Sequence, residues 1–266
     1  MPKLPCNGFE LHYAISGVGV PLVFLNGLAG DHLYWAGQVR TFSKEFLCLA
    51  LDNRDAGQSS YAESAYSISD LADDVFHLLG SLGLPPAHVV GLSLGGMIAQ
   101  ELALRHPQAV RSLALIGTLA RPDAWFLDLL DAFGIIRRHV ADSGAFFEAV
   151  LPWLVSHRFY QESGRAEWLK ALLRQSPYPQ RIDGFFRQFD AIRRHDALDR
   201  LGNVRCRVLV AVGEHDAIIP PRYSHELAAR LPHAQLRVLP GVGHAPPLEA
   251  PREFNRMLLE FLRDEP

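Results

Sequence analysis

Short apolar runs alternate along the chain with longer segments of helical period. Residues 9–15 place large apolar side chains at every second position, which is the pattern of a half-buried strand. The turn at residues 16–20 contains two glycines, and we therefore expect an antiparallel opening pair of strands. Continuous apolar runs bounded by turn residues follow at 21–25, 46–51, 88–92, 112–116 and 208–212. Such runs are typical of strands that are buried on both faces of a parallel sheet.

Amphipathic helices are predicted between these runs. Apolar side chains in residues 71–82 recur at i, i+4, i+7, i+8 and i+11, with Ser67 or Ser69 available to cap the start and Gly83 to end the helix. The same period appears in residues 95–106, 222–231 and 252–262. Because strands and helices alternate, we predict an α/β fold with a mostly parallel central sheet flanked by helices. The length of 266 residues fits one domain of this kind, residues 1–266.

The segment from about residue 120 to 198 breaks this alternation. It holds no convincing strand, but apolar side chains recur there at helical spacing, interrupted by prolines. We predict that this segment is an all-helical insertion, called the cap below, which covers a ligand site. Most cap aromatics should pack the inserted helices together. Trp125 and Phe126, near the start of the insertion, are the expected walls of a substrate pocket.

A G-x-S-x-G motif occupies residues 91–95, at the junction of a predicted strand and a predicted helix. A side chain on such a sharp turn projects above the sheet edge. The two glycines are needed because a Cβ at either position would clash with the reversed backbone. We therefore predict that Ser93 is a nucleophile.

A serine hydroxyl needs a base that accepts its proton and a third group that orients this base. His244 lies in a loop between the last predicted strand and the final helix, at the same sheet edge as Ser93. Asp216 follows another predicted strand at its carboxyl end. The chain order Ser93, Asp216, His244 is the one associated with this type of sheet. The other candidates for the acid are Glu214 and Asp190.

Backbone N–H groups are expected to stabilise the oxyanion that forms when a serine attacks a carbonyl. Leu94 follows the nucleophile at the start of a helix. The second donor should come from the glycine-rich turn at residues 26–30, called the oxyanion turn below. Leu28 is the residue of this turn that we expect to donate.

These residues carry a resemblance to the α/β-hydrolase fold superfamily, in its cofactor-free, single-cap group of lactonases, esterases and C–C bond hydrolases. The likeness runs from about residue 21 to 262. It includes residues 52–59 (DNRDAGQS), which are similar to the D-x-R-G-x-G-x-S turn of that group, and residues 243–246 (GHAP). The resemblance implies the α/β-hydrolase fold with an inserted helical cap. Haloalkane dehalogenases and epoxide hydrolases of this fold use an Asp nucleophile, where this chain has Ser93.

Three positions depart from the pattern of that group. Asn26 stands where a histidine usually precedes the oxyanion glycine. Asp55 replaces the usual glycine of the D-x-R-G turn, as in a subset that resembles anthracycline methylesterases. Arg207 replaces the proline that is common before the strand of the acid.

Composition narrows the range of partners. The 26 basic and 29 acidic residues give a net charge of −3, without the basic excess typical of nucleic-acid binders. The three cysteines lie far apart, and no metal-ligand spacing or nucleotide loop occurs, so neither a metal nor a cofactor is implied. No apolar run approaches the roughly 18 residues of a bilayer span. We expect a cytoplasmic protein that binds no membrane, and the sequence leaves its oligomeric state open.

The candidate triad predicts a hydrolase that cleaves a small carboxylic ester or lactone through an acyl-enzyme intermediate. The alternatives are a C–C bond hydrolase acting on a ring-fission product, a perhydrolase or acyltransferase, and a non-catalytic ligand receptor of the same fold. An aromatic cap over the serine favours compact, largely apolar small-molecule substrates. The natural substrate and its stereochemistry stay open.

Overall fold

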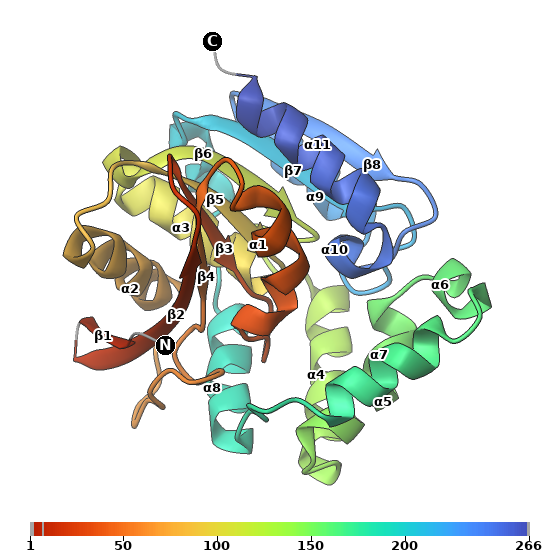
Figure 1. Cartoon of the computed structure of the whole chain (residues 1–266). Helices are drawn as coiled ribbons and strands as arrows, with labels where there is room; N and C mark the ends of the chain where they lie inside the picture. Colours follow the sequence, from red (N-terminus) through yellow and green to blue (C-terminus); the bar gives the residue numbers. More distant parts are fainter. Residues whose placement is uncertain (1–2, 7, 265–266) are drawn as a thin grey trace.

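An eight-stranded sheet forms the centre of the computed structural model, which describes residues 3–6 and 8–264 (Figure 1). Its strand order is β1-β2-β4-β3-β5-β6-β7-β8. The strands are β1 (Lys3–Cys6), β2 (Phe9–Ser16), β3 (Pro21–Leu25), β4 (Leu47–Leu51), β5 (Ala87–Leu92), β6 (Val110–Ile116), β7 (Arg207–Gly213) and β8 (Ala234–Leu239). β2 pairs antiparallel with β1 and β4, whereas all neighbours from β4 to β8 run parallel. The prediction of a mostly parallel sheet is confirmed.

The antiparallel pair expected across the turn at residues 16–20 is not formed, because β2 pairs with β1 and β4 instead. The turn at residues 16–20 leads to β3, which β4 separates from β2 in the sheet. The order of the central strands therefore requires a crossover between β3 and β4, which η1 (His32–Trp35) and α1 (Ala36–Phe42) supply.

Helices cover both faces of the sheet. In β3, Val23 and Leu25 pack in one apolar cluster with α2, α3 and α9, whereas Leu22 and Phe24 pack in another with α1 and α11. Burial on both faces explains why the strands are continuous apolar runs. Among residues 3–6 and 8–264, no helix is both long and apolar enough to cross a membrane. The other elements around the sheet are α2 (Ile68–Ser81), α3 (Leu94–Arg105), η2 (Pro107–Ala109), η3 (Leu198–Asn203), α9 (Pro221–Arg230), α10 (Pro246–Glu249) and α11 (Pro251–Arg263).

Ser67, rather than Ser69, caps the start of α2. Its hydroxyl oxygen accepts a hydrogen bond from the Asp70 N–H, and the Asp70 carboxylate accepts one from the Ser67 N–H. This reciprocal capping box satisfies two N–H groups that have no partner within the helix. Gly83 follows the helix with a φ of +63°, a conformation that glycine adopts without steric cost. The start and the end of this helix were therefore encoded locally.

The cap is all-helical, as predicted. Residues 117–206, all of which the structure describes, contain no strand. Figure 1 shows the cap helices gathered in the lower part of the molecule, apart from the helices that flank the sheet. The cap helices are α4 (Ala124–His139), α5 (Ser143–Leu154), α6 (His157–Gln161), α7 (Arg165–Arg174) and α8 (Ile182–Arg193).

Two cysteine side chains, Cys48 and Cys206, carry free thiols. Burial raises the pKa of Cys48 to about 12 and that of Cys206 to about 11. Neither thiol is therefore a nucleophile at neutral pH. The side chain of Cys6 lies outside the described residues.

Candidate active site

Ser93 lies on the sharp turn between β5 and α3, with φ of +53° and ψ of −116°. A Cβ on Gly91 would lie 2.2 Å from the Gly95 carbonyl oxygen, and one on Gly95 would lie 2.3 Å from that of Leu25. Both glycines are therefore required by close approach of backbone to backbone. The Ser93 N–H donates to the Ile116 carbonyl oxygen of β6 over 2.9 Å, which fixes the turn to the neighbouring strand.

Asp216 and His244 form a buried hydrogen-bonded pair. His244 Nδ1 lies 2.8 Å from Asp216 Oδ2, and the two residues are 5% and 3% exposed. Asp216 Oδ1 accepts hydrogen bonds from the N–H groups of Ile218 at 2.9 Å and Ile219 at 2.8 Å. These two bonds hold the carboxylate so that its other oxygen faces the imidazole. The arrangement can fix a His244 tautomer that carries its proton on Nδ1.

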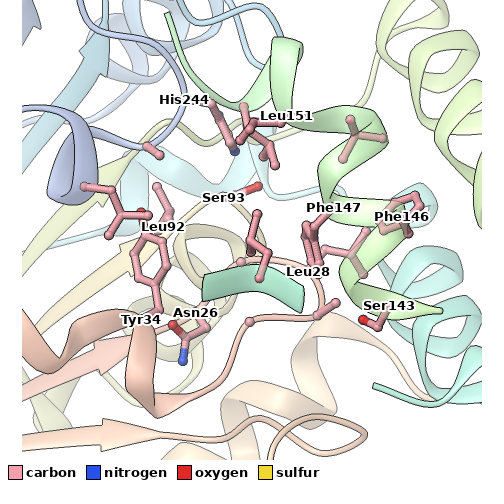
Figure 2. Close-up of a pocket in the computed structure, with 18 of the residues that line it drawn as sticks. Asn26, Leu28, Tyr34, Leu92, Ser93, Ser143, Phe146, Phe147, Leu151 and His244 are labelled. Atoms are coloured by element: carbon pink, nitrogen blue, oxygen red, sulfur yellow. The ribbon is translucent and has the colours of Figure 1, made fainter. Parts of the chain in front are cut away.

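Ser93 and His244 line the same cavity, which has a volume of about 320 Å³. Figure 2 shows the Ser93 hydroxyl and the His244 ring facing each other in this cavity. Gly117, with φ of +48°, packs closely against Asp216 and His244. A Cβ at this position would lie 3.1 Å from Asp216 Oδ2 and 3.3 Å from His244 Nδ1. The structure thus brings the three residues of the predicted triad to one place.

The two other candidates for the acid lie elsewhere. The Glu214 carboxylate accepts a hydrogen bond from the Gly241 N–H over 2.9 Å, and half of its side chain is exposed. Asp190 is exposed on α8. Asp216 is accordingly the carboxylate that contacts the imidazole of His244.

The two expected oxyanion donors flank the nucleophile. Leu94 is the first residue of α3, and a Cβ on Gly27 of the oxyanion turn would lie 3.3 Å from Ser93 Cβ. Within the described residues, the N–H groups of Leu28 and Leu94 donate no hydrogen bond to a protein group. Both are therefore free to bind a ligand oxygen, and the N-terminus of α3 adds a favourable dipole for negative charge.

The cap supplies most of the cavity wall. No lysine or arginine is among the lining residues, all of which the structure describes, and Asp31 is the one carboxylate among them. The cavity therefore offers a mostly apolar environment without a positively charged side chain, and Ser93 and His244 are among its polar lining residues. Its apolar lining side chains from α4, α5 and α7 are Phe126, Leu129, Leu130, Phe133, Phe146, Phe147, Val150, Leu151, Leu154, Leu169, Leu172 and Leu173.

The two expected pocket walls, Trp125 and Phe126, point in different directions. Phe126 is buried and lines the cavity. Trp125 does not line it: the side chain is 45% exposed, and the Arg222 guanidinium lies 5.0 Å from its ring centroid. The expectation that Trp125 is a wall of the pocket is therefore wrong. The reason lies at the start of α4, where Asp123 caps the helix and accepts hydrogen bonds from Tyr223 and Arg222, which fixes the helix with Trp125 outward.

The sequence did not predict two contacts of the oxyanion turn. The Asn53 side chain donates to the Asn26 carbonyl oxygen over 3.3 Å. Gln188 Oε1 in α8 accepts a hydrogen bond from the Ala29 N–H over 3.0 Å. Since 159 positions separate Ala29 and Gln188, no local pattern could have revealed this contact.

A family model described as the alpha/beta hydrolase fold matches residues 20–251. The chain belongs to the alpha/beta hydrolase fold family. The sheet order, the turn that carries Ser93 and the positions of Asp216 and His244 after β7 and β8 agree with this membership. The fold predicted from the sequence is confirmed.

Relatives of this alpha/beta hydrolase include several enzymes of the same size. It is 32% identical to the "Putative carbamate hydrolase RutD" of Variovorax paradoxus, over 95% of this chain and 96% of the relative. It is similar to the enol-lactonase from Burkholderia xenovorans, with a TM-score of 0.90, 29% identity and coverage of 99% and 100% of the two chains. It is also similar to a thermophilic esterase from Thermogutta terrifontis, with a TM-score of 0.86, 26% identity and coverage of 98% and 97%. These similarities support a hydrolase of this fold.

The three residues that depart from the pattern of the alpha/beta hydrolase group each make a specific side-chain contact. Asn26 donates from its side chain to the Leu51 carbonyl oxygen of β4 over 3.0 Å. Asp55 has φ of +68° and forms an ion pair with Arg187 of the cap, with 2.8 Å between Oδ2 and Nε. Arg207 begins β7, and its guanidinium packs over an aromatic ring of α11, 4.9 Å from the centroid.

One buried cluster has the residue types of a metal site. The side chains of His12, His32 and Asp52 bring their ligand atoms within 4.8 Å of one another. Asp52 Oδ2 lies 2.7 Å from His12 Nδ1, and Asp52 Oδ1 lies 3.0 Å from His32 Nδ1. Burial alone would raise the pKa of Asp52, but hydrogen bonds from His32 and Gln58 hold it below its usual value. The cluster therefore acts as a hydrogen-bonded anchor that ties β2 and η1 to the residue 52–59 turn.

Proposed function

We propose that this alpha/beta hydrolase cleaves small carboxylic esters or lactones through an acyl-enzyme on Ser93. The observation that carries the proposal is the hydrogen-bonded Asp216–His244 pair beside Ser93, at the floor of an apolar cavity. A nucleophile, a base and a group that orients the base are the three parts that serine chemistry requires. The similarity to a lactonase and an esterase supports the same class of reaction.

In the proposed reaction, His244 Nε2 accepts the proton of the Ser93 hydroxyl while Oγ attacks the carbonyl carbon of the substrate. The N–H groups of Leu28 and Leu94 donate to the oxyanion of the tetrahedral intermediate, and one such donor contributes about 3 to 4 kcal/mol. His244 then gives the proton to the departing alcohol oxygen. A water molecule, deprotonated by the same imidazole, then attacks the acyl carbon. The imidazolium returns the proton to Ser93 Oγ as its bond to the acyl group breaks and the carboxylic acid leaves. Asp216 stabilises the imidazolium that forms in each step.

The lining of the cavity favours an uncharged acyl group. A ring-fission dienoate carries a carboxylate, and burying this charge without a cationic partner is costly. The cavity offers no lysine or arginine side chain among its described residues. Ester and lactone substrates with apolar acyl groups are therefore preferred over the substrates of a C–C bond hydrolase.

The test compares p-nitrophenyl acetate with a ring-fission dienoate, using the wild type and Ser93→Ala. We expect the wild type to hydrolyse the ester much faster than the dienoate, and Ser93→Ala to lose ester hydrolysis while it keeps its fold. Ester hydrolysis by folded Ser93→Ala would overturn the nucleophile. A preference for the dienoate would overturn the reaction class.

A further inference from the structure

Among the described residues, one hydrogen bond joins the cap to the oxyanion turn, and its acceptor is a buried amide. The Ala29 N–H donates to Gln188 Oε1 over 3.0 Å, and Gln188 is fully buried, with 0% of the residue exposed. Gln180 Nε2 also donates to Gln188 Oε1, over 3.1 Å. Gln188 Nε2 donates to the Arg54 carbonyl oxygen over 3.0 Å. Because Oε1 accepts two hydrogen bonds and Nε2 donates one, the side-chain amide of Gln188 is held in one orientation.

The Ala29 backbone of the oxyanion turn needs a hydrogen-bond acceptor to hold its conformation. Ala29 has φ of +61°, in the left-handed region that residues with a Cβ rarely adopt. A conformation of this kind persists only where the surroundings hold it. The hydrogen bond from the Gly30 N–H to the Gly27 carbonyl oxygen, 3.1 Å long, closes the turn but does not bind the Ala29 N–H. Gln188 supplies the missing acceptor.

The peptide group that Gln188 binds is next to the expected oxyanion donor. The Ala29 N–H belongs to the peptide that follows Leu28, so fixing its direction limits rotation about the Leu28 Cα–C bond. We propose that Gln188 is a positioning residue that aims the Leu28 N–H at the oxyanion, so that the cap helps to assemble the catalytic site. The proposal rests on the function proposed above, because it requires Leu28 to be an oxyanion donor.

A neighbouring residue on α8 offers a matched control. Arg187 binds Asp55 through two hydrogen bonds of 2.8 and 3.0 Å, and thereby docks α8 on the turn at residues 52–59. Arg187 has no hydrogen bond to the oxyanion turn in the described part of the chain. Loss of Arg187 thus weakens the docking of the same helix without removing the acceptor of the Ala29 N–H.

The experiment uses the full chain with Gln188→Met, Gln188→Glu and Arg187→Met. Methionine is similar in length to glutamine but offers no amide. A glutamic acid side chain, protonated in this buried position, keeps an acceptor for Ala29 and a donor for the Arg54 carbonyl oxygen. In p-nitrophenyl acetate hydrolysis we expect Gln188→Met to lower kcat by about 10- to 100-fold with KM within about threefold. We expect Gln188→Glu to recover most of this loss and Arg187→Met to stay within about threefold of wild type.

Amide hydrogen exchange supplies a readout that does not depend on activity. We expect exchange of the Ala29 N–H to accelerate in Gln188→Met and to stay protected in Gln188→Glu and Arg187→Met. Equal loss of kcat in Gln188→Met and Arg187→Met, or unchanged protection of Ala29 in Gln188→Met, would overturn the positioning role. If Gln188→Met does not fold, an unprotected Ala29 N–H in folded Gln188→Glu would overturn it. Normal exchange behaviour in a wild type that hydrolyses no ester would instead overturn the proposed function.

Discussion

Replacing Asp216 with asparagine tests the geometry of the candidate triad most sharply. In the wild type, Oδ1 accepts from the Ile218 and Ile219 N–H groups, and Oδ2 faces His244 Nδ1. Both N–H groups need an acceptor, so the amide oxygen of Asn should stay on them. The NH₂ group of the amide would then face His244 Nδ1. Because two donors cannot bond each other, the ring would take the tautomer that carries its proton on Nε2, which cannot accept the Ser93 proton.

The change of tautomer determines the size of the effect. A wrong tautomer in a triad of this kind lowers kcat by about 10³- to 10⁴-fold, which corresponds to about 4 to 5.5 kcal/mol of transition-state stabilisation. Asparagine and aspartate have nearly the same shape, so the cavity is unchanged and KM should stay within about threefold. Asp216→Ala leaves the ring free to choose its tautomer. We therefore expect the alanine variant, where folded, to be no slower than the asparagine variant.

The assay is steady-state hydrolysis of p-nitrophenyl acetate, with thermal unfolding of each variant as the control for folding. Asp216→Asn that retains more than about a tenth of the wild-type kcat would refute the tautomer argument. Such a result would also show that Asp216 does not orient His244. A large decrease in the melting temperature of Asp216→Asn would show that the hydrogen bonds from the Ile218 and Ile219 N–H groups were not preserved.

The base, the pocket wall and a buried histidine can each be tested separately. The value of kcat/KM should fall in acid, because only neutral His244 can accept the Ser93 proton, and a profile without an acid limb would contradict this role. Phe126→Ala should change the order in which p-nitrophenyl esters of different acyl chain length are preferred, since each methylene in the cavity contributes about 1 kcal/mol to the relative kcat/KM. Trp125→Ala, outside the cavity, should leave this order unchanged. Burial lowers the pKa of His195 from 6.5 to about 4, so between these values the unfolded chain binds more protons than the folded chain. The free energy of unfolding should therefore drop as the pH falls from 6.5 to 4, by up to about 3 kcal/mol from this group, and urea unfolding of His195→Gln should lack that part of the drop.

The fold could be predicted because its signals are local. Strands buried on both faces must be apolar at every position, and Leu22, Val23, Phe24 and Leu25 meet this requirement in β3. The turn around Ser93 could also be predicted from the sequence. Gly91 and Gly95 are required there because a Cβ at either position would clash with nearby backbone, that of Gly95 itself or that of the end of the adjacent strand. The carboxyl ends of parallel strands share one sheet edge, which made the chain order of the triad informative.

Other features depend on tertiary packing and left no local signal. Trp125 and Phe126 are adjacent on an amphipathic helix, and only the contacts of Asp123 with α9 determine which of them faces the cavity. Gln188 is a polar residue on a cap helix, and such residues are usually solvated. Its burial arises because α8 packs against two turns that precede it by more than a hundred positions, as its bonds to Ala29 and Arg54 show.

The most direct test of Ser93 as the nucleophile is to map the site of covalent modification by a fluorophosphonate. Peptide mass spectrometry would locate the adduct, and residual p-nitrophenyl acetate hydrolysis would be measured on the same sample. We predict one adduct per chain, on Ser93, with activity falling in proportion to modification and no adduct in Ser93→Ala. An adduct on another residue that abolishes activity, or full ester hydrolysis by a chain modified at Ser93, would contradict the acyl-enzyme mechanism.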